Sequence, residues 1–262
     1  MKNTETAIAI DNLSKRFNND VVALQDVNLH IEPSDFLTLV GPSGCGKSTL
    51  LRIIAGLSDK STGEIHWRDR TLKEQLAFVF QEPALMPWAT VRDNVRLPLK
   101  LAGVSKQTAD ETIAKTLELV NLANFAKAYP RQLSGGMKMR VSIARALVTE
   151  PNILLMDEPF GALDDITRTN LNDELLSLWN QQRPTVVFVT HNIYEAVYLS
   201  KRVVVMAARP GRAIAEIPID EPLPRTGAFR TSEAYLEYCR EVSAALSQAM
   251  DSQPRSPVGF AG

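Results

Sequence analysis

Residues 41–48 read Gly41-Pro42-Ser43-Gly44-Cys45-Gly46-Lys47-Ser48 and match the pattern G-x-x-x-x-G-K-[ST]. The apolar run 36–40 before them predicts a buried strand, and the apolar positions within 47–56 predict a helix after them. A strand, a glycine turn and a helix in this order are the setting in which such a loop binds phosphate. A glycine-rich turn that arose by chance would not require this setting, so we expect nucleotide binding.

The residue types in this loop suit a polyphosphate ligand. Glycines let successive backbone N–H groups turn toward phosphate oxygens, and the amino end of the helix adds partial positive charge. Lys47 supplies a full charge for the outer phosphates, Ser48 offers a hydroxyl to Mg²⁺, and Thr49 is placed to reach an inner phosphate. ATP and Mg²⁺ are therefore the expected cofactors.

Two carboxylates follow a second apolar run, 153–156. Strands of an open α/β sheet present ligand residues at their carboxyl ends. Asp157 is then the natural partner of Mg²⁺, and Glu158 is the natural group to polarise an attacking water. An ordinary strand followed by an exposed acidic turn would look the same, but the phosphate loop upstream favours the functional interpretation.

The order of apolar runs predicts an α/β fold of the P-loop NTPase type with a mostly parallel sheet. The expected strands are 21–31, 36–40, 77–80, 153–156, 185–190 and 202–206, and the clearest expected helices are 47–56, 108–120, 134–147, 166–179, 193–199 and 232–249. The helix-rich region at about 86–150 should form a helical subdomain. We expect an ATPase domain over 1–210 and a C-terminal extension over 211–262 with one helix and a mobile tail.

The composition excludes several classes of protein. The 262 residues include 45% hydrophobic and 23% charged residues, which is ordinary for a globular protein. A net charge of −1 argues against general nucleic-acid binding, so no nucleic-acid partner is expected. Cys45 and Cys239 are too few and too far apart for a disulfide framework. No apolar run reaches bilayer length, so any membrane role should act through a partner.

The run Leu133-Ser134-Gly135-Gly136-Met137 opens a predicted helix and can again cradle phosphate. Alone it would more simply be a loop–helix junction capped by Ser134. Because it lies between the phosphate loop and the acidic strand, the chain resembles the ATP-binding subunits of ABC transporters over about residues 8–210. The resemblance implies the ABC ATPase fold, with an N-terminal antiparallel β part, and ATP hydrolysis coupled to transport.

Two features resemble one subgroup of this family. The signature usually reads L-S-G-G-Q, and Met137 in place of Gln is similar to importers of nitrate, sulfonates, taurine and related compounds. Arg209-Pro210-Gly211-Arg212 and the proline-rich stretch after it resemble the same subgroup. Met139, where the family would have glutamine, departs from the pattern. The resemblance favours import of a small anionic nutrient.

The resemblance assigns four further residues. Gln81 looks like the loop glutamine that senses Mg²⁺, water and the membrane partner; Asp164 resembles the loop that crosses the dimer interface. His191 resembles the switch histidine at the γ-phosphate, and Phe17 looks like the aromatic residue that stacks on adenine. Without the other motifs, each could be a solvated loop or core residue.

In this family the signature of one subunit closes over the ATP bound by the other. The resemblance therefore implies a homodimer in which Lys47, Ser48, Gln81, Asp157, Glu158 and His191 act from one chain and Ser134, Gly135 and Gly136 from its partner, with Asp164 communicating across. It also implies integral-membrane permease subunits, a periplasmic or lipid-anchored substrate-binding protein, and a peripheral location on the cytoplasmic face of the inner membrane.

The loop 84–88 is apolar and follows Gln81, so it predicts a contact with a permease helix, unless it fills the subdomain's own core. Three other functions stay open: an ABC exporter subunit, a soluble ABC ATPase of DNA repair or translation, and a nucleotide-gated binding module. The short insert between Gln81 and Ser134 and the single cassette argue against the repair and translation types, and Glu158 argues against the binding module.

Overall fold

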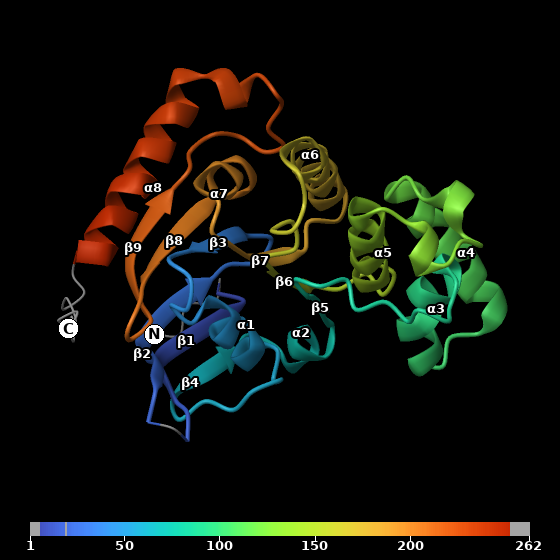
Figure 1. The fold of residues 1–262 in the computed structure, drawn as a ribbon. Helices are drawn as coiled ribbons and strands as arrows, with labels where there is room; N and C mark the ends of the chain where they lie inside the picture. Colours follow the sequence, from blue (N-terminus) through green and yellow to red (C-terminus); the bar gives the residue numbers. More distant parts are fainter. Residues whose placement is uncertain (1–5, 19, 252–262) are drawn as a thin grey trace, which may run out of the picture.

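The computed structural model describes residues 6–18 and 20–251. Two sheets lie at the centre, and one group of helices stands to the side of them (Figure 1). None of the helices in the described ranges combines the length and the apolar character that crossing a bilayer requires. The expected mobile tail falls almost wholly on residues 252–262, which lie outside the described residues.

The larger sheet has six strands in the order β5-β6-β7-β3-β8-β9. They are β3 (Phe36–Val40), β5 (Leu76–Val79), β6 (Ile153–Asp157), β7 (Thr185–Thr190), β8 (Arg202–Ala207) and β9 (Arg212–Pro218). All pair in parallel except β9, which runs antiparallel to β8. The predicted α/β fold with a mostly parallel sheet is confirmed.

The central strand shows why these runs are continuously apolar. Phe36 and Val40 belong to one hydrophobic cluster, whereas Leu37 and Leu39 belong to another. Side chains alternate between the faces of a strand, so β3 contributes to a core on each face of the sheet. Both faces are covered, and among the described residues the one side-chain hydrogen bond of this strand is that between Thr38 and the hydroxyl of Ser200.

The smaller sheet is antiparallel and has the order β2-β1-β4. Its strands are β1 (Ile8–Arg16), β2 (Val22–Ile31) and β4 (Thr62–Trp67). The implied N-terminal antiparallel part is therefore confirmed. Residues 8–16 and 62–67 were not expected to be strands, because β1 has register shifts and β4 alternates only between exposed and half-buried residues.

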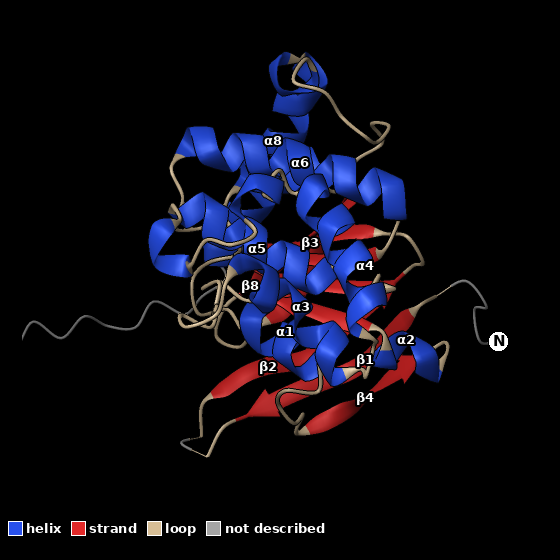
Figure 2. Cartoon of the chain, turned by 90° about the vertical axis from the view of Figure 1, so that its right-hand side faces the viewer, coloured by secondary structure: helices blue, strands red, loops and turns tan. Residues whose placement is uncertain are grey.

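The helical group consists of three helices that pack on one another (Figures 1 and 2). They are α3 (Val91–Leu101), α4 (Lys106–Leu119) and α5 (Gly135–Leu147), joined by the short turns η1 (Ala123–Phe125) and η2 (Pro130–Gln132). Each helix begins after a capping side chain, Thr90, Ser105 or Ser134, that accepts a backbone N–H of the first turn. The region predicted to be helical is helical, and its three helices lie beside the sheets.

The remaining helices cover the two sheets or extend from them. They are α1 (Lys47–Ile54), α2 (Arg70–Glu74), α6 (Asp165–Gln182), α7 (Ile193–Leu199) and α8 (Glu233–Asp251), with the turn η3 (Phe229–Thr231) before α8. In Figure 1, α8 lies along β8 and β9 and reaches α7, which agrees with its contacts.

The chain on both sides of residue 210 is joined to the two sheets. Strand β9 belongs to the large sheet, and Gly211 exchanges backbone hydrogen bonds with Ala23 and Gln25 of β2. A Cβ atom on Gly211 would lie 2.1 Å from the backbone oxygen of Cys45, so only glycine allows this approach to the phosphate loop. The sheet continues through Pro218, and the segment after residue 210 holds a strand and η3 besides the expected helix.

Candidate functional site

The parallel strands bring the predicted residues to one edge of the large sheet. Val40 pairs with Thr190, so the loop that starts at Gly41 leaves the sheet beside His191. Asp157 ends β6 at the same edge, where it pairs with a residue of β7. Carboxyl ends of parallel strands share an edge, and this is where open α/β sheets bind ligands.

The phosphate loop depends on glycine at two positions. Gly44 and Gly46 have φ values of 77° and 92°, which side chains other than glycine rarely adopt. A Cβ atom on Gly46 would also lie 2.6 Å from the Cδ2 atom of Leu24. Gly46 therefore lets α1 begin directly against β2, with the first backbone N–H groups of the helix facing the loop.

Lys47 is the cation of this loop. Its Nζ atom donates to the carbonyl oxygens of Gly41 at 2.8 Å and Pro42 at 3.2 Å, and the residue is buried. The ammonium group therefore lies inside the curve of the loop, where a phosphate would meet it. The thiol of Cys45 lies 3.7 Å from the same Nζ atom, and burial raises the pKa of this thiol.

Ser48 and Asp157 form a pair of oxygen ligands. The hydroxyl of Ser48 donates to Oδ1 of Asp157 at 2.7 Å, and burial raises the pKa of that carboxyl group. A buried carboxylate beside a hydroxyl is a hard oxygen donor set of the kind that Mg²⁺ takes together with phosphate oxygens. Residues 6–18 and 20–251 contain no group of three or more acidic, histidine or cysteine side chains that could hold a metal ion. Ser48 and Asp157 would therefore bind Mg²⁺ together with the phosphate oxygens of the nucleotide.

Glu158 and His191 face each other across the ends of β6 and β7. Oε2 of Glu158 lies 3.0 Å from Nδ1 of His191, and the backbone N–H of Glu158 donates to Val189 at 2.9 Å. Glu158 has a φ of 45°, a backbone conformation that costs about 1 kcal/mol or more for such a residue. This turn aims a carboxylate at the edge of the sheet where the phosphate loop begins.

Gln81 and Phe17 both lie at exposed positions, and the strand register places Gln81 at this edge. β5 and β6 are in register at Val79 and Met156, so Gln81 leaves the sheet at the same level as Glu158. Phe17 is 43% exposed, and the ammonium group of Lys15 lies 5.2 Å from the centre of its ring. A half-exposed ring of this kind has a face free for stacking.

The signature residues lie away from the phosphate loop of their own chain. Ser134 caps α5, and a Cβ atom on Gly135 or Gly136 would meet Leu163 at 3.4 Å or Thr167 at 2.7 Å. Asp164 caps α6 by accepting the N–H of Thr167 at 2.9 Å, which lowers the pKa of its carboxyl group. Among the described hydrogen bonds, none joins residues 134–136 to residues 41–49.

The family model for ABC transporters matches residues 24–161. The chain belongs to the ABC transporter family. It is an ATPase that couples ATP hydrolysis to transmembrane transport, and its family binds ATP, as the sequence resemblance implied.

Several relatives match this ABC protein over most of its length. The aliphatic sulfonates import ATP-binding protein SsuB of Bacillus cereus (strain ATCC 10987 / NRS 248) is 45% identical over 90% of this chain and 94% of its own. An uncharacterized ABC transporter ATP-binding protein of Methanocaldococcus jannaschii is 48% identical over 90% of this chain and 89% of its own. The chain therefore spans nearly the whole length of these relatives.

Solved structures agree with this assignment. A dimeric bacterial ABC transporter cassette superposes with a TM-score of 0.72 at 33% identity, covering 82% of this chain and 100% of that one. The same cassette in a post-hydrolysis state with ADP and Pi gives a TM-score of 0.72 at 32% identity, again over 82% and 100%.

Two residues close to His191 were not singled out from the sequence. Thr190 and Glu195 flank His191 in the sequence, and both are buried. The hydroxyl of Thr190 donates to Oε2 of Glu195 at 2.5 Å. The signal that could have found them is a glutamate in the first turn of the helix after the histidine, a position from which side chains fold back.

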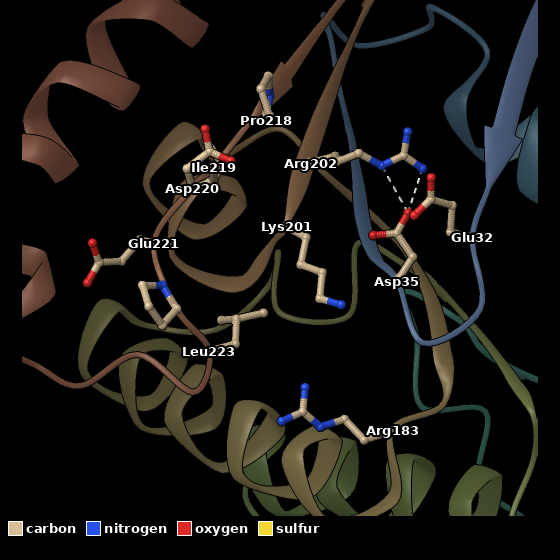
Figure 3. A pocket seen from close by; sticks show the side chains of 11 residues that line it. Glu32, Asp35, Arg183, Lys201, Arg202, Pro218, Ile219, Asp220, Glu221 and Leu223 are labelled. Atoms are coloured by element: carbon tan, nitrogen blue, oxygen red, sulfur yellow. Dashed lines mark hydrogen bonds and ion pairs between the residues drawn. The ribbon is translucent and has the colours of Figure 1, made fainter. Parts of the chain in front are cut away.

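A hollow of about 490 Å³ lies elsewhere in this ABC protein. Figure 3 shows Lys201 and Arg183 pointing into it, and Arg202 paired with Asp35 at its wall. Asp35 comes just before β3 and Lys201 just before β8, so the hollow lies at the amino ends of the parallel strands. It is at the opposite edge from residues 41–48 and is separate from the nucleotide site.

Proposed function

We propose that this chain energises an importer for a small anionic nutrient, with aliphatic sulfonates as the first candidates and taurine and nitrate as the next. The carrying observation is the 45% identity to a sulfonate import subunit over 90% of the chain. Met137 and the Arg209-Pro210-Gly211-Arg212 turn, which resemble the same subgroup, support it. We further propose a substrate-binding protein as an indirect partner and a peripheral location on the cytoplasmic face of the membrane.

The geometry supports a division of roles at the ATP site. Lys47 and the backbone of residues 41–49 hold the phosphates, and Phe17 stacks on adenine. Ser48 and Asp157 hold Mg²⁺, with Gln81 beside them. When bound, Mg²⁺ neutralises phosphate charge that develops during the transfer.

Hydrolysis needs a group that orients water and a group that senses the γ-phosphate. Glu158 accepts a proton from the attacking water while the oxygen of that water bonds to the γ-phosphorus. ADP leaves with the electrons of the broken P–O bond. His191, 3.0 Å from Glu158, contacts the γ-phosphate. Both side chains lie on turns fixed by the ends of β6 and β7, so catalysis rests on positioning rather than on a covalent intermediate.

The site is incomplete in a single chain. Ser134 is exposed, and Gly135 and Gly136 lie against Leu163 and Thr167, at the start of α6, instead of against their own phosphate loop. We infer that these residues close over the ATP of a second copy, with Asp164 crossing the interface. The dimeric cassette to which the chain is similar supports this arrangement.

We expect a sulfonate to stimulate ATP hydrolysis when the chain is assembled with its permease and binding protein in lipid vesicles. The binding protein delivers the anion to the permease, and the permease closes the ATPase dimer. The measurement is phosphate release when ethanesulfonate, taurine, nitrate or no substrate is present on the side of the vesicle membrane that carries the binding protein. Stimulation by none of these three compounds, or only when they are on the side of the vesicle that carries the ATPase, would count against import of this class.

The loop 84–88 is a preformed contact surface on the helical subdomain, which we propose spans about residues 86–150. Asn94, fully buried, accepts the N–H of Met86 at 2.8 Å and donates to the carbonyl oxygens of Met86, Ala89 and Thr90. Trp88 is nevertheless 77% exposed. A rigid loop that presents a tryptophan to solvent suits a docking site for a permease helix.

Trp88→Ala should weaken assembly with the permease by at least about tenfold and leave the ATPase rate of the isolated chain unchanged, because a central tryptophan is worth about 2 kcal/mol or more at an interface. The measurement is co-purification of the tagged permease, with ATP hydrolysis measured alongside. Leu57→Ala is the matched control, since Leu57 is 58% exposed but lies outside the helical subdomain. Equal recovery of the permease with Trp88→Ala and with the wild type would refute the docking role.

A further inference from the structure

A buried hydroxyl holds the backbone on both sides of His191. Oγ1 of Thr190 donates to Oε2 of Glu195 at 2.5 Å and accepts the backbone N–H of Asn192 at 3.0 Å. Thr190 is 3% exposed and Glu195 is 5% exposed, so water does not compete for these bonds. The residue before the histidine and the residue after it are therefore fixed through one oxygen atom.

The hydrogen bonds at the start of α7 form a helix cap that includes one residue more than the usual capping box. Asn192 caps the helix by accepting the N–H of Glu195 at 3.2 Å. A glutamate at this position commonly reaches back to the N–H of the capping residue. Here Thr190 takes that N–H, and Glu195 bonds to the hydroxyl of Thr190 instead. The cap thus includes the last residue of β7 and encloses His191.

The far end of α7 is also held in place. Arg225 is buried and donates to the carbonyl oxygens of Val197 at 2.5 Å and Tyr198 at 2.9 Å. At the start of α7, the hydroxyl of Tyr235, on α8, donates to the carbonyl oxygen of Tyr194 at 2.8 Å. With both ends of α7 fixed, the contacts at its start set the direction in which His191 leaves the sheet.

A carboxyl group is a costly choice for this buried position. Burial raises the pKa of Glu195 to about 6, and Arg168 of α6 and His191 are the charged groups that partly offset this. An apolar side chain would fill the same space without the desolvation cost. The retained carboxyl group is explained if the hydrogen bond to Thr190 has a use beyond filling the core.

We propose that Glu195 is a positioning residue that, through the hydroxyl of Thr190, holds the imidazole of His191 in line with Glu158 and the γ-phosphate. This inference rests on the proposed role of His191 at the ATP site. Thr190 and Glu195 do not touch the nucleotide-binding loop through any of the described hydrogen bonds, so they act on turnover and not on ATP binding.

Thr190→Val tests the role of the hydroxyl, because valine keeps the branched shape and removes the oxygen. In the full chain, kcat for MgATP should fall by at least about tenfold while KM changes by less than about twofold, since small displacements of a catalytic group cost turnover. Thr190→Ser restores the hydroxyl and should restore kcat to within about threefold of wild type, because the same hydrogen bonds form again. Glu195→Leu should behave like Thr190→Val, and Glu195→Gln, which keeps an acceptor oxygen, like Thr190→Ser.

Thr185→Val is the matched control on the same strand. Thr185 is also buried, and its hydroxyl accepts the N–H of Ser34 at 3.1 Å, at the end of β7 away from the site. Thr185→Val should lower the melting temperature and leave kcat at the wild-type value. The proposal is overturned if Thr190→Val keeps wild-type kcat, or if Thr190→Ser loses as much kcat as Thr190→Val.

His191→Ala separates this proposal from the one on which it rests. If His191→Ala loses turnover and Thr190→Val does not, His191 keeps its role and the positioning through Glu195 is wrong. If His191→Ala turns over at the wild-type rate, the role of His191 itself fails, and the positioning proposal fails with it. Loss of kcat in both, with turnover preserved in Thr185→Val, supports both proposals.

Discussion

Glu158→Gln is expected to lower kcat for ATP hydrolysis by at least about 100-fold without weakening ATP binding, because general base catalysis supplies a factor of that size. Glutamine keeps the shape of the side chain and an oxygen that can face Nδ1 of His191, 3.0 Å away in the wild type. Its neutral amide cannot accept the proton of the attacking water. With hydrolysis blocked, the ATP-bound dimer should persist, so light scattering after size exclusion in MgATP should report a dimer.

Glu150→Gln is the matched control for this prediction. Glu150 is an exposed glutamate after α5 and also has a positive φ, 49° compared with 45° at Glu158. The control therefore makes the same chemical change in the same backbone conformation, outside the site. It should hydrolyse ATP at the wild-type rate and show no persistent dimer. A Glu158→Gln protein that turns over at the wild-type rate would contradict the assignment of Glu158 as the base.

The buried strands could be predicted from the sequence because their apolar character is continuous. The residues of β3 and β7 are buried throughout, and their predicted bounds are those observed. β4 and β9 offer no such run, since exposed and half-buried residues alternate along most of their length. Both strands form because a neighbouring strand supplies the pairing: β4 pairs with β1, which lies far earlier in the sequence, and β9 pairs with β8, which comes directly before it. The predicted domain boundary at residue 210 falls between β8 and β9, two strands that pair with each other.

The candidate site residues also differ in how far the sequence could predict them. The candidate residues whose chemistry is carried by a local motif, such as Lys47 and Glu158, could be proposed from the sequence, because the motif and the apolar strand before it are contiguous. The contacts among them, such as Ser48 with Asp157, join residues that are 109 positions apart in the sequence and depend on the order of the parallel strands. Glu195 was missed because a glutamate in the first turn of a helix is ordinarily a solvated cap residue. Only its burial against Thr190 distinguishes it.

Lys47→Ala is expected to raise the Kd for MgATP by about 10- to 100-fold, the range that corresponds to losing a charge-assisted hydrogen bond of about 1.5–3 kcal/mol. Lys47 is the only charged residue in the loop 41–48, and it is 4% exposed, so solvent screens its charge poorly. The measurement is a titration of MgATP followed by the melting temperature. Ligand that binds only the folded state stabilises it by RT ln(1 + [L]/Kd), so the variant should show a smaller rise at each concentration.

Lys60→Ala separates the charge of Lys47 from its contacts within the loop. Lys60 also donates to a backbone carbonyl of its own turn, that of Gly63, but it is exposed and outside the site. It should bind MgATP as the wild type does. In the absence of nucleotide, Lys47→Ala frees the carbonyl oxygens of Gly41 and Pro42, so some loss of stability is expected from the loop alone. If the variant melts lower but keeps the wild-type Kd, Lys47 holds the loop together and does not bind phosphate.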